Sequence, residues 1–389
     1  MPRTAHSDNS SLRDSVRALC AEFPNEYWRE LDRTRSYPED FVNALTKAGY
    51  LAALVPAEYG GMGLGMREAS TILEEINRSG GNATACHAQM YTMGALLKHG
   101  SDEQKLRYLP RIASGELRLQ GFSITEPEAG SDTTRIVTQA VKDGDSYVIS
   151  GHKNWTSRVE QSDLLIVLAR TTPRRDEDKT SGLSLFLVDL QQVRRDQPEA
   201  LEVEPVTVMF NYPTNRVTYR NLRVPADALL GEEDNGFRHV IDGWNAERIL
   251  LSSEAIGDGY WFIDRASTYA SDRRVFDRYI GENQGVQFPI AQAYVDVRAA
   301  DLMRSDAADL FDRGEPCGAE ANMAKLLSSK ASWAAANVCL DTHGGNGFVD
   351  TFDVERKFRE TRLYSVAPVS NNLVLGFVAT KLLGMPRSY

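Results

Sequence analysis

Residues 115–132 read GELRLQGFSITEPEAGSD, and near Leu117, within this stretch, the spacing of apolar residues changes. Upstream, apolar residues recur every three or four positions, which is typical of helices. Downstream, short apolar runs such as DLLIVLA (163–169) and LSLFLVD (183–189) indicate strands. Helical spacing returns after Asn235 in long stretches that predict a helix bundle. We therefore expect a chain that is mainly α-helical with a central β domain.

These changes in spacing predict three domains. We expect an N-terminal α-helical domain over residues 1–117, a middle β domain over 118–232 and a C-terminal helical bundle domain over 233–389. A length of 389 residues suits two or three structural units of roughly 100 to 200 residues. Within the first domain, Ser101 and Gln104 have the spacing of a capping box at a helix start.

Composition disfavours several classes of function. Acidic residues outnumber basic ones, 54 to 44, and the net charge of −10 makes nucleic acid an unexpected partner. The strongest apolar run, LLIVLA from Leu164, is far shorter than the roughly 18 residues of a membrane span. The N-terminus lacks the apolar core of a secretory signal, so we expect a cytoplasmic location. The four cysteines lie far apart without a C-x-x-C pair, so neither disulfides nor a metal site is predicted.

Two segments of the β region carry residue types that suit a bound cofactor. In GFSITEPEAGSD (121–132), a Gly-Ser pair in a tight turn can bring backbone N–H groups close to an anion such as a pyrophosphate. The alternative is an ordinary hairpin turn. In HKNWTSR (152–158), Trp155 stands beside Thr156 and Ser157, an aromatic plane next to hydroxyl donors. The alternative for this tryptophan is a place in the core.

These two segments resemble signatures of the acyl-CoA dehydrogenase family, and the resemblance extends over nearly the whole chain. It implies a flavoenzyme with an N-terminal helical domain, a middle β-barrel or sandwich domain and a C-terminal four-helix bundle, which binds FAD between the last two. The motifs that carry it, in the family's order, are VPAEYGGMGLG (55–65), ITEPEAGSD (124–132), RVPADALLGEEDNGF (223–237), RRVFDRYIGENQGVQF (273–288) and HGGNGF (343–348).

The resemblance implies a set of residues that bind FAD. In the middle domain, three of them flank the flavin ring, two contact the pyrophosphate, one covers the ring and one donates near flavin N5. Phe122, Ile124 and Thr125 match the residues that flank the ring, and Gly130 and Ser131 match those that contact the pyrophosphate. Trp155 matches the residue that covers the ring, and Ser157 matches the donor near flavin N5. In the C-terminal domain, Arg273 and Phe276 match residues that reach FAD from a neighbouring subunit, and Gln284, Gly344 and Gly345 match contacts on the adenosine side. Asp341 replaces the family's usual Gln at the same site.

The position of the catalytic base is unusual. Dehydrogenation between Cα and Cβ of a thioester needs a carboxylate to accept the α-proton, and in most of the family this is a glutamate just before the final helix. Here Pro368 takes that place, and no acid follows Thr361. The sequence is similar to isovaleryl-CoA dehydrogenase-like members, which carry the base on the helix that opens the bundle. The matching residue is Glu247, and the alternative is a surface ion pair.

Substrate contacts are also implied by the resemblance. Asn245 and Arg248 match positions near the mouth of the active site, with ordinary helix polarity as the alternative, and Trp244 is expected to shape the acyl pocket. Ser131 and Pro368 match further substrate contacts. Proline has no N–H, so the usual backbone donor to the thioester carbonyl is missing at Pro368, and the neighbouring Val369 N–H is a candidate replacement.

The expected function is therefore FAD-dependent α,β-dehydrogenation of an acyl-CoA or acyl-carrier-protein thioester. The α-proton would go to Glu247 and the β-hydride to flavin N5, with electrons passed to an electron-transfer flavoprotein. Cross-subunit cofactor contacts imply a homodimer or homotetramer. Two alternatives remain open at this point: a flavin-dependent monooxygenase or oxidase on the same fold, and a non-catalytic family member that binds flavin or CoA.

Overall fold

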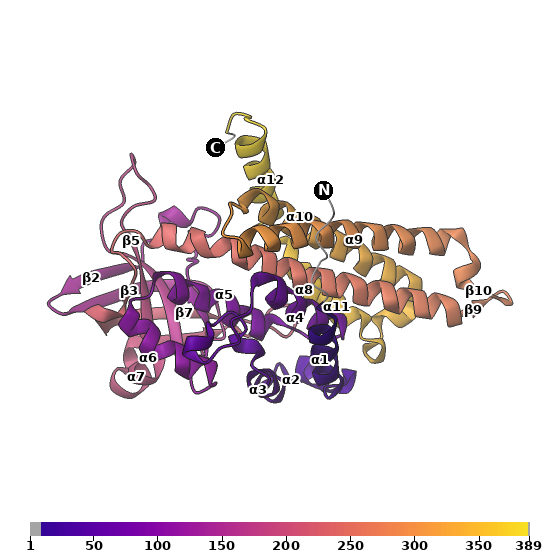
Figure 1. The fold of residues 1–389 in the computed structure, drawn as a ribbon, viewed down its shortest axis with the longest axis horizontal. Coiled ribbons are helices and arrows are strands. Elements are labelled where there is room, and N and C mark those ends of the chain that lie inside the picture. Colours follow the sequence, from indigo (N-terminus) through magenta and orange to yellow (C-terminus); the bar gives the residue numbers. More distant parts are fainter. Residues whose placement is uncertain (1–8, 388–389) are drawn as a thin grey trace. The chain divides into compact units, whose positions relative to one another are not determined.

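The computed structural model describes residues 9–387 (Figure 1). The chain forms two compact units, each built from separate segments of the sequence. The sheet unit comprises residues 45–63 and 85–244, and the helical unit comprises, of the described residues, 9–44, 64–84 and 245–387. Each is described by itself below.

The sheet unit contains eight strands. Seven of them are hydrogen-bonded in the order β6-β7-β3-β2-β4-β5-β8, and β1 pairs in parallel with β4. All the other pairings are antiparallel except the short one between β2 and β4. The strands are β1 (Leu119–Ser123), β2 (Gln139–Asp143), β3 (Ser146–Ser157), β4 (Leu164–Arg170), β5 (Leu183–Asp189), β6 (Leu201–Pro205), β7 (Thr214–Pro225) and β8 (Leu229–Leu230).

Both faces of the sheet are buried around β4 and β5. Because successive side chains of a strand point to opposite faces, the continuous apolar run of β4 feeds two separate cores. Leu164, Ile166 and Leu168 join one core, while Leu165 and Val167 join the other. Helices α5 (Thr84–His99) and α6 (Asp102–Ala113) contribute to the first core, and α7 (Leu190–Asp196) contributes to the second. Because both faces of β4 are buried, its side chains do not alternate between apolar and polar.

The helical unit is built around three long helices that run alongside one another (Figure 1). Residues 248–263 of α8 are buried on every side, including polar ones such as Ser252 and Asp258. A two-stranded hairpin, β9 (Arg274–Val275) and β10 (Arg278–Tyr279), joins α8 to α9. The helices are α1 (Ser10–Ala21), α2 (Asn25–Thr34), α3 (Glu39–Lys47), α4 (Met66–Arg78), α8 (Gly236–Asp272), α9 (Gln284–Asp312), α10 (Gly318–His343), α11 (Val354–Thr361) and α12 (Asn371–Phe377).

The predicted fold class, mainly α with a central β domain, is confirmed. The capping box is also present, because Ser101 Oγ accepts from Gln104 N–H and the Gln104 side chain accepts from Ser101 N–H. The spacing pattern did not reveal the β9–β10 hairpin or α11, which are too short to show a period. The three domain boundaries stay a prediction. All four cysteines are buried free thiols.

Candidate active site

The middle-domain residues predicted to meet the flavin ring gather where β1 and β3 end. The backbone N–H of Asn154 donates to the carbonyl of Thr125 at 2.8 Å, and the hydroxyls of Ser123 and Thr156 lie 3.1 Å apart. These bonds hold the turn after β1 against the end of β3. As a result, the five predicted ring contacts of this region come together: Phe122, Ile124, Thr125, Trp155 and Ser157.

Trp155 has an unusual backbone conformation. Its φ is +60°, and it lies in a bulge where the pairing of β3 with β7 shifts register between Lys153 and Thr156. A left-handed conformation is rare for a bulky residue and is found most often at functional sites. Trp155 is 56% exposed. The alternative of a core tryptophan is therefore wrong, and the ring is displayed as a flat apolar surface.

A buried ion pair supports this turn from within the sheet unit. Lys153 is fully buried, and its Nζ donates to the carbonyl of Ile124 at 2.8 Å and to Glu126 Oε1 at 2.9 Å. The Glu126 carboxylate also accepts from the N–H groups of Val137 and Thr138. Burial opposes its ionisation, but Lys153 and these donors keep the pKa of Glu126 below its usual value. Burial lowers the pKa of Lys153 to about 8.

Gly130 and Ser131 lie in an exposed turn beside this support. Glu126 and Ala129 exchange two backbone hydrogen bonds of 3.2 Å, and Thr133 Oγ1 donates to the Gly130 carbonyl at 3.1 Å. A Cβ placed on Gly130 would meet only Thr125 Cγ2, at 4.0 Å. The chain's own packing therefore does not require glycine at position 130, whereas close approach of a phosphate to the backbone would.

An apolar wall lies next to the ring contacts. Phe122, Ile124 and Trp244 pack against the same core of the sheet unit. The ring of Tyr91, on α5, stacks on that of Phe122 with centroids 6.2 Å apart. Tyr91 was not predicted as a site residue, because nothing in the sequence relates α5 to the end of β1. The exposed indole, the hydroxyl donors, the open glycine turn and this wall fit a flavin with its phosphates.

In the helical unit, the predicted base lies in a cluster of polar side chains near the start of the α8 segment. Asn245 Oδ1 accepts a hydrogen bond from Arg248 Nη1 at 3.2 Å. Glu247, which lies between these two residues in the sequence, is half-buried. Burial lowers the pKa of Arg248, an effect that the charge of Glu247 partly opposes. Arg248 in turn contributes to the lowered pKa of Lys325 on α10, which is mainly due to burial. The side chains of α8 and α10 therefore meet here.

The loop that contains Pro368 joins the same cluster. Lys325 Nζ donates to the carbonyl of Val369 at 2.5 Å and to Asn371 Oδ1 at 2.8 Å. Ser329 Oγ donates to the same Asn371 oxygen at 3.1 Å. Lys325 thus links the Pro368 loop to the helix that contacts Arg248, and this places the loop and Glu247 at one end of the bundle.

The predicted adenosine-side residues lie at the other end of α8. Arg273 follows the last residue of the helix, and Phe276 is at the tip of the β9–β10 hairpin with φ of +50° and 95% exposure. Gln284 is the exposed first residue of α9. A nearly fully exposed phenylalanine on a tight turn is typical of a residue that packs against another molecule.

The end of α10 meets the same end of α8. The His343 ring stacks on that of Tyr269 with centroids 4.2 Å apart, and Asn346 donates to the Tyr269 hydroxyl at 2.9 Å. Asp341, Gly344 and Gly345 are exposed beside these contacts, and a Cβ on either glycine would meet nothing within 4 Å. The structure thus gathers all six predicted adenosine-side residues in one region of the helical unit.

In the helical unit, the cluster around Glu247 lies far from the predicted adenosine-side residues. Glu247 and Asp272 are separated by 25 residues of continuous helix, which is about 38 Å at 1.5 Å per residue. That distance is longer than a flavin dinucleotide reaches. Within one chain, Glu247 and the hairpin residues therefore cannot contact the same cofactor molecule.

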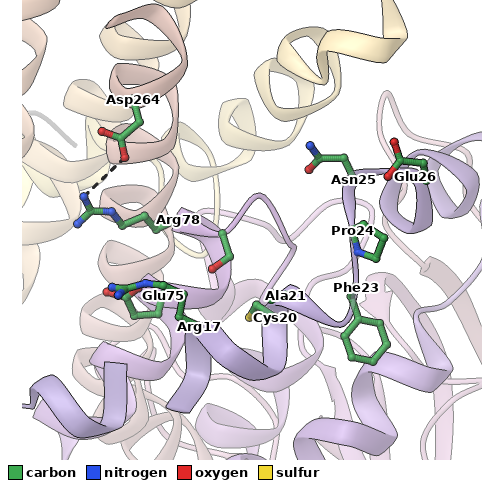
Figure 2. Close-up of a pocket in the computed structure, with 11 residues that line it drawn as sticks. Arg17, Cys20, Ala21, Phe23, Pro24, Asn25, Glu26, Glu75, Arg78 and Asp264 are labelled. Atoms are coloured by element: carbon green, nitrogen blue, oxygen red, sulfur yellow. Dashed lines mark hydrogen bonds and ion pairs between the residues drawn. The ribbon is translucent and has the colours of Figure 1, made fainter. Parts of the chain in front are cut away.

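A separate pocket of about 740 Å³ lies among α1, α2, α4 and α8 (Figure 2). Four of its charged groups pair with one another, Arg17 with Glu75 at 3.1 Å and Arg78 with Asp264 at 3.6 Å, while Glu26 pairs with Arg29 at 2.6 Å. None of the predicted site residues lines it. Among residues 9–387 no cluster of His, Cys, Asp and Glu is suited to a metal ion, and no helix is long and apolar enough to cross a membrane.

Comparison with known proteins identifies the family. Models of the N-terminal, middle and C-terminal domains of acyl-CoA dehydrogenases match residues 6–116, 121–221 and 234–383. The chain therefore belongs to the acyl-CoA dehydrogenase family, a family of flavin-dependent oxidoreductases.

Individual relatives match along almost the whole chain. The chain is 36% identical to the acyl-CoA dehydrogenase fadE12 of Mycobacterium bovis, over 98% of this chain and 97% of the relative. It is 32% identical to a 3-(aryl)acrylate reductase of Clostridium sporogenes, over 91% and 93% of the two chains. Among solved structures, a glutaryl-CoA dehydrogenase in complex with glutaryl-CoA superposes with a TM-score of 0.90 at 28% identity, covering 100% and 98% of the two chains.

Proposed function

We propose that this protein catalyses FAD-dependent α,β-dehydrogenation of an acyl thioester carried by CoA or by an acyl carrier protein, with Glu247 as the base. The observation that carries the proposal is the cluster at one end of the helical unit. It brings the only carboxylate matched to a family base, Glu247, to the same region as the acid-free loop of Pro368. Membership of the family supports the reaction class.

In this proposal Glu247 accepts the α-proton on a carboxylate oxygen. Arg248 follows Glu247 in sequence, and the two side chains lie close enough for their charges to interact. Trp244 and Phe122 exclude water from the acyl chain, and Asn245 and Ser131 contact the thioester and its carrier. Bound FAD supplies the hydride acceptor for the β-carbon.

The residues proposed to hold FAD fall into two sets. Phe122, Ile124, Thr125, Gly130, Ser131, Trp155 and Ser157 would hold the ring and pyrophosphate of one molecule. Arg273, Phe276, Gln284, Asp341, Gly344 and Gly345 would hold the adenosine end of a molecule bound mainly by a second copy of the chain. The 38 Å separation along α8 supports a homodimer or homotetramer. An electron-transfer flavoprotein is the proposed acceptor, and 1–117, 118–232 and 233–389 are the proposed domains.

The test of the reaction is an anaerobic titration of the purified, FAD-loaded protein with straight and branched acyl-CoAs, followed by visible absorbance. Bleaching of the flavin band without NADH or NADPH would establish dehydrogenation and narrow the substrate. A yellow protein that no acyl-CoA or acyl carrier protein bleaches would contradict the proposal and favour the monooxygenase or oxidase alternative. A protein unable to bind FAD would favour a non-catalytic family member.

The test of the base is Glu247→Gln. The variant keeps the shape of the side chain but cannot accept a proton, so we expect α-proton exchange of a bound thioester with D₂O to fall by about 10² to 10⁴-fold while FAD stays bound. Glu315→Gln is a matched control, because Glu315 is an exposed glutamate paired with Arg313. Exchange at the normal rate in Glu247→Gln would exclude Glu247 as the base.

A further inference from the structure

Four arginines in the described part of the chain are less than a tenth exposed, and they differ in their partners. Three of them interact with a carboxylate: Arg304 with Glu74, Arg356 with Glu360 and Arg248 with Glu247. The fourth is Arg158, which is 3% exposed. Its side chain forms no hydrogen bond and no ion pair with any of residues 9–387, and its Nη2 is enclosed without a partner.

The recorded contact of the Arg158 guanidinium is an aromatic face. Its Cζ lies 4.8 Å from the ring centroid of Tyr212. A cation above a ring is attracted by the π electrons, but the ring carries no net negative charge. Buried cations are normally compensated by a counter-ion, because removal of their water is costly. The positive charge of Arg158 is therefore not balanced by any residue that the structure describes.

Arg158 lies in a turn that is tied to the predicted ring contacts. It directly follows Ser157, the predicted donor near flavin N5, and its φ is +58°. Its N–H donates to the carbonyl of Pro213 at 3.1 Å, and Ser157 Oγ donates to Thr214 Oγ1 at 3.4 Å. A left-handed conformation is uncommon for a residue other than glycine and is found most often at functional sites. The turn that places Ser157 therefore also fixes Arg158.

The charge of Arg158 can act on a cofactor only through space. Its side chain is enclosed by protein, whereas Trp155, three positions earlier, is exposed where a flavin ring would pack. Neighbouring Cα atoms are about 3.8 Å apart, so the guanidinium is within the length of one arginine side chain of the Ser157 backbone. Solvent and salt screen a buried charge much less than an exposed one. A flavin held by Ser157 would therefore be under the influence of this charge.

We propose that the unbalanced charge of Arg158 raises the reduction potential of the FAD bound beside Ser157. The inference rests on the proposed function, because it needs FAD at the ring contacts of the sheet unit. When FAD accepts a hydride, the electron pair of the broken C–H bond moves to the flavin together with the hydrogen, and the flavin gains one negative charge. A fixed positive charge nearby stabilises this negative charge. Arg158 thereby favours transfer of electrons from the acyl thioester to FAD.

The test compares Arg158→Met with Arg194→Met in the FAD-loaded protein. Arg194 is an exposed residue of α7 that donates to the carbonyls of Val159 and Ser162, so it supports the same turn from the solvent side. The readout is the midpoint potential of bound FAD, measured anaerobically against a reference dye and without a substrate. Two unit charges about 12 Å apart, at an effective dielectric constant of about 20, change an equilibrium by about tenfold. In Arg158→Met we therefore expect the ratio of reduced to oxidised FAD at a fixed potential to fall about tenfold, which is a potential about 30 mV lower.

Two variants separate the charge of Arg158 from the shape of the turn. Arg158→Lys keeps the positive charge, so its ratio of reduced to oxidised FAD should stay close to that of wild type. Arg194→Met removes a charge that solvent screens, so the ratio should change by less than about twofold. An unchanged ratio in FAD-loaded Arg158→Met would overturn the inference. A fall in Arg158→Lys or Arg194→Met as large as that in Arg158→Met would also overturn it, because the shape of the turn would then be the cause.

A second pair of variants keeps the proposal testable if Arg158→Met does not fold. Tyr212→Glu keeps Arg158 but places a carboxylate where the ring now contacts the guanidinium. The charge is then balanced, and the midpoint potential should fall. Tyr212→Gln removes the ring without adding a charge, so its potential should stay close to that of wild type. Equal potentials in these two variants would overturn the inference.

Failure of the inference and failure of the proposed function give different results. If wild type holds FAD but no thioester bleaches it, the proposed function has failed, and the midpoint potentials still decide the role of Arg158. If wild type is bleached by a thioester and the potential does not respond to Arg158→Met, only the role of Arg158 has failed. A wild-type protein that takes up no FAD would overturn both.

Discussion

The sheet unit and the helical unit each use a fully buried lysine to hold a turn that belongs to the candidate site, but they do so in different electrostatic settings. Lys153 binds the carbonyl of Ile124 together with the carboxylate of Glu126. Lys325 binds the carbonyl of Val369 together with the amide of Asn371. The first arrangement balances its charge and the second does not. The difference teaches that a buried lysine can hold a turn either with a compensating carboxylate, as Lys153 does, or without a carboxylate among its hydrogen-bond partners, as Lys325 does.

The largest expected effect is on stability in the sheet unit. Lys153→Met leaves the buried Glu126 carboxylate without its cation, and breaking a buried pair in this way costs about 3 to 5 kcal/mol. Lys325→Met leaves no buried carboxylate but removes the donor to the Val369 carbonyl and the Asn371 amide oxygen, so its cost in free energy of unfolding should be smaller, about 1 to 3 kcal/mol. Denaturant unfolding of the two variants measures both. An equal loss in the free energy of unfolding for Lys153→Met and Lys325→Met would contradict the expected difference between the two lysines.

A second substitution should repair part of the first. In Lys153→Met, replacing Glu126 by Gln removes the uncompensated charge and keeps an acceptor for one of the two N–H groups, those of Val137 and Thr138, that donate to separate oxygens of Glu126. We expect the double variant to be about 1 to 3 kcal/mol more stable than Lys153→Met alone. A double variant less stable than both singles would mean that charge is not the reason for the loss.

The third prediction concerns pH. The pKa of Lys325 is about 8 in the folded protein, below its ordinary value of 10.5, because of burial and then Arg248. Between these two values the unfolded chain binds more protons, so this group makes the free energy of unfolding rise as pH rises from about 8 to about 10.5. Below pH 8 the full penalty applies.

Lys325→Met should therefore show a smaller rise than wild type over this window. The measurement is denaturant unfolding at pH 7.5 and pH 10 for both proteins, with Lys330→Met as control because Lys330 is exposed. The rise that remains in Lys325→Met includes the contribution of Lys153, whose pKa is also lowered to about 8. Identical slopes for wild type and Lys325→Met would contradict an unbalanced buried charge.

The smallest effect is expected at Ser329. Its hydroxyl donates to Asn371 Oδ1 at 3.1 Å and so helps to hold the side chain that accepts from Lys325. Its removal leaves the charge of Lys325 unchanged. In denaturant unfolding, Ser329→Ala should lower the free energy of unfolding by about 0.5 to 1.5 kcal/mol, the usual net worth of one hydrogen bond. A loss as large as that of Lys325→Met would show that the charge of the lysine is not what matters.

The candidate site was partly predictable from sequence. Phe122, Thr125, Trp155 and Ser157 were predicted because their motifs resemble those of the family, and the structure brings the four residues together. Lys153 and Glu126 stand inside the same quoted motifs, yet their pairing was missed. A lysine inside an alternating strand reads as a surface residue unless the opposite face is known to be buried.

Lys325 and Tyr91 were missed for a different reason. Both are on helices whose sequences contain no motif, and their partners are distant, Val369 in one case and Phe122 in the other. Helical spacing predicts that a residue faces the core, but it does not predict which distant segment of the chain that residue will contact. The exposure of Trp155 and its φ of +60° could not be predicted from the sequence either, because a bulge depends on the register between strands.

The order of helices, strands and helices, the capping box at Ser101 and the absence of an acid after Thr361 were determined by the sequence alone, because they depend on residues within a few positions of one another. Only the tertiary structure decided that Lys325 meets the loop after Pro368 and that Lys153 meets Glu126. It also separated Glu247 from the β9–β10 hairpin by the length of α8. The physical reason is that such contacts join segments distant in sequence, and packing of whole elements sets them.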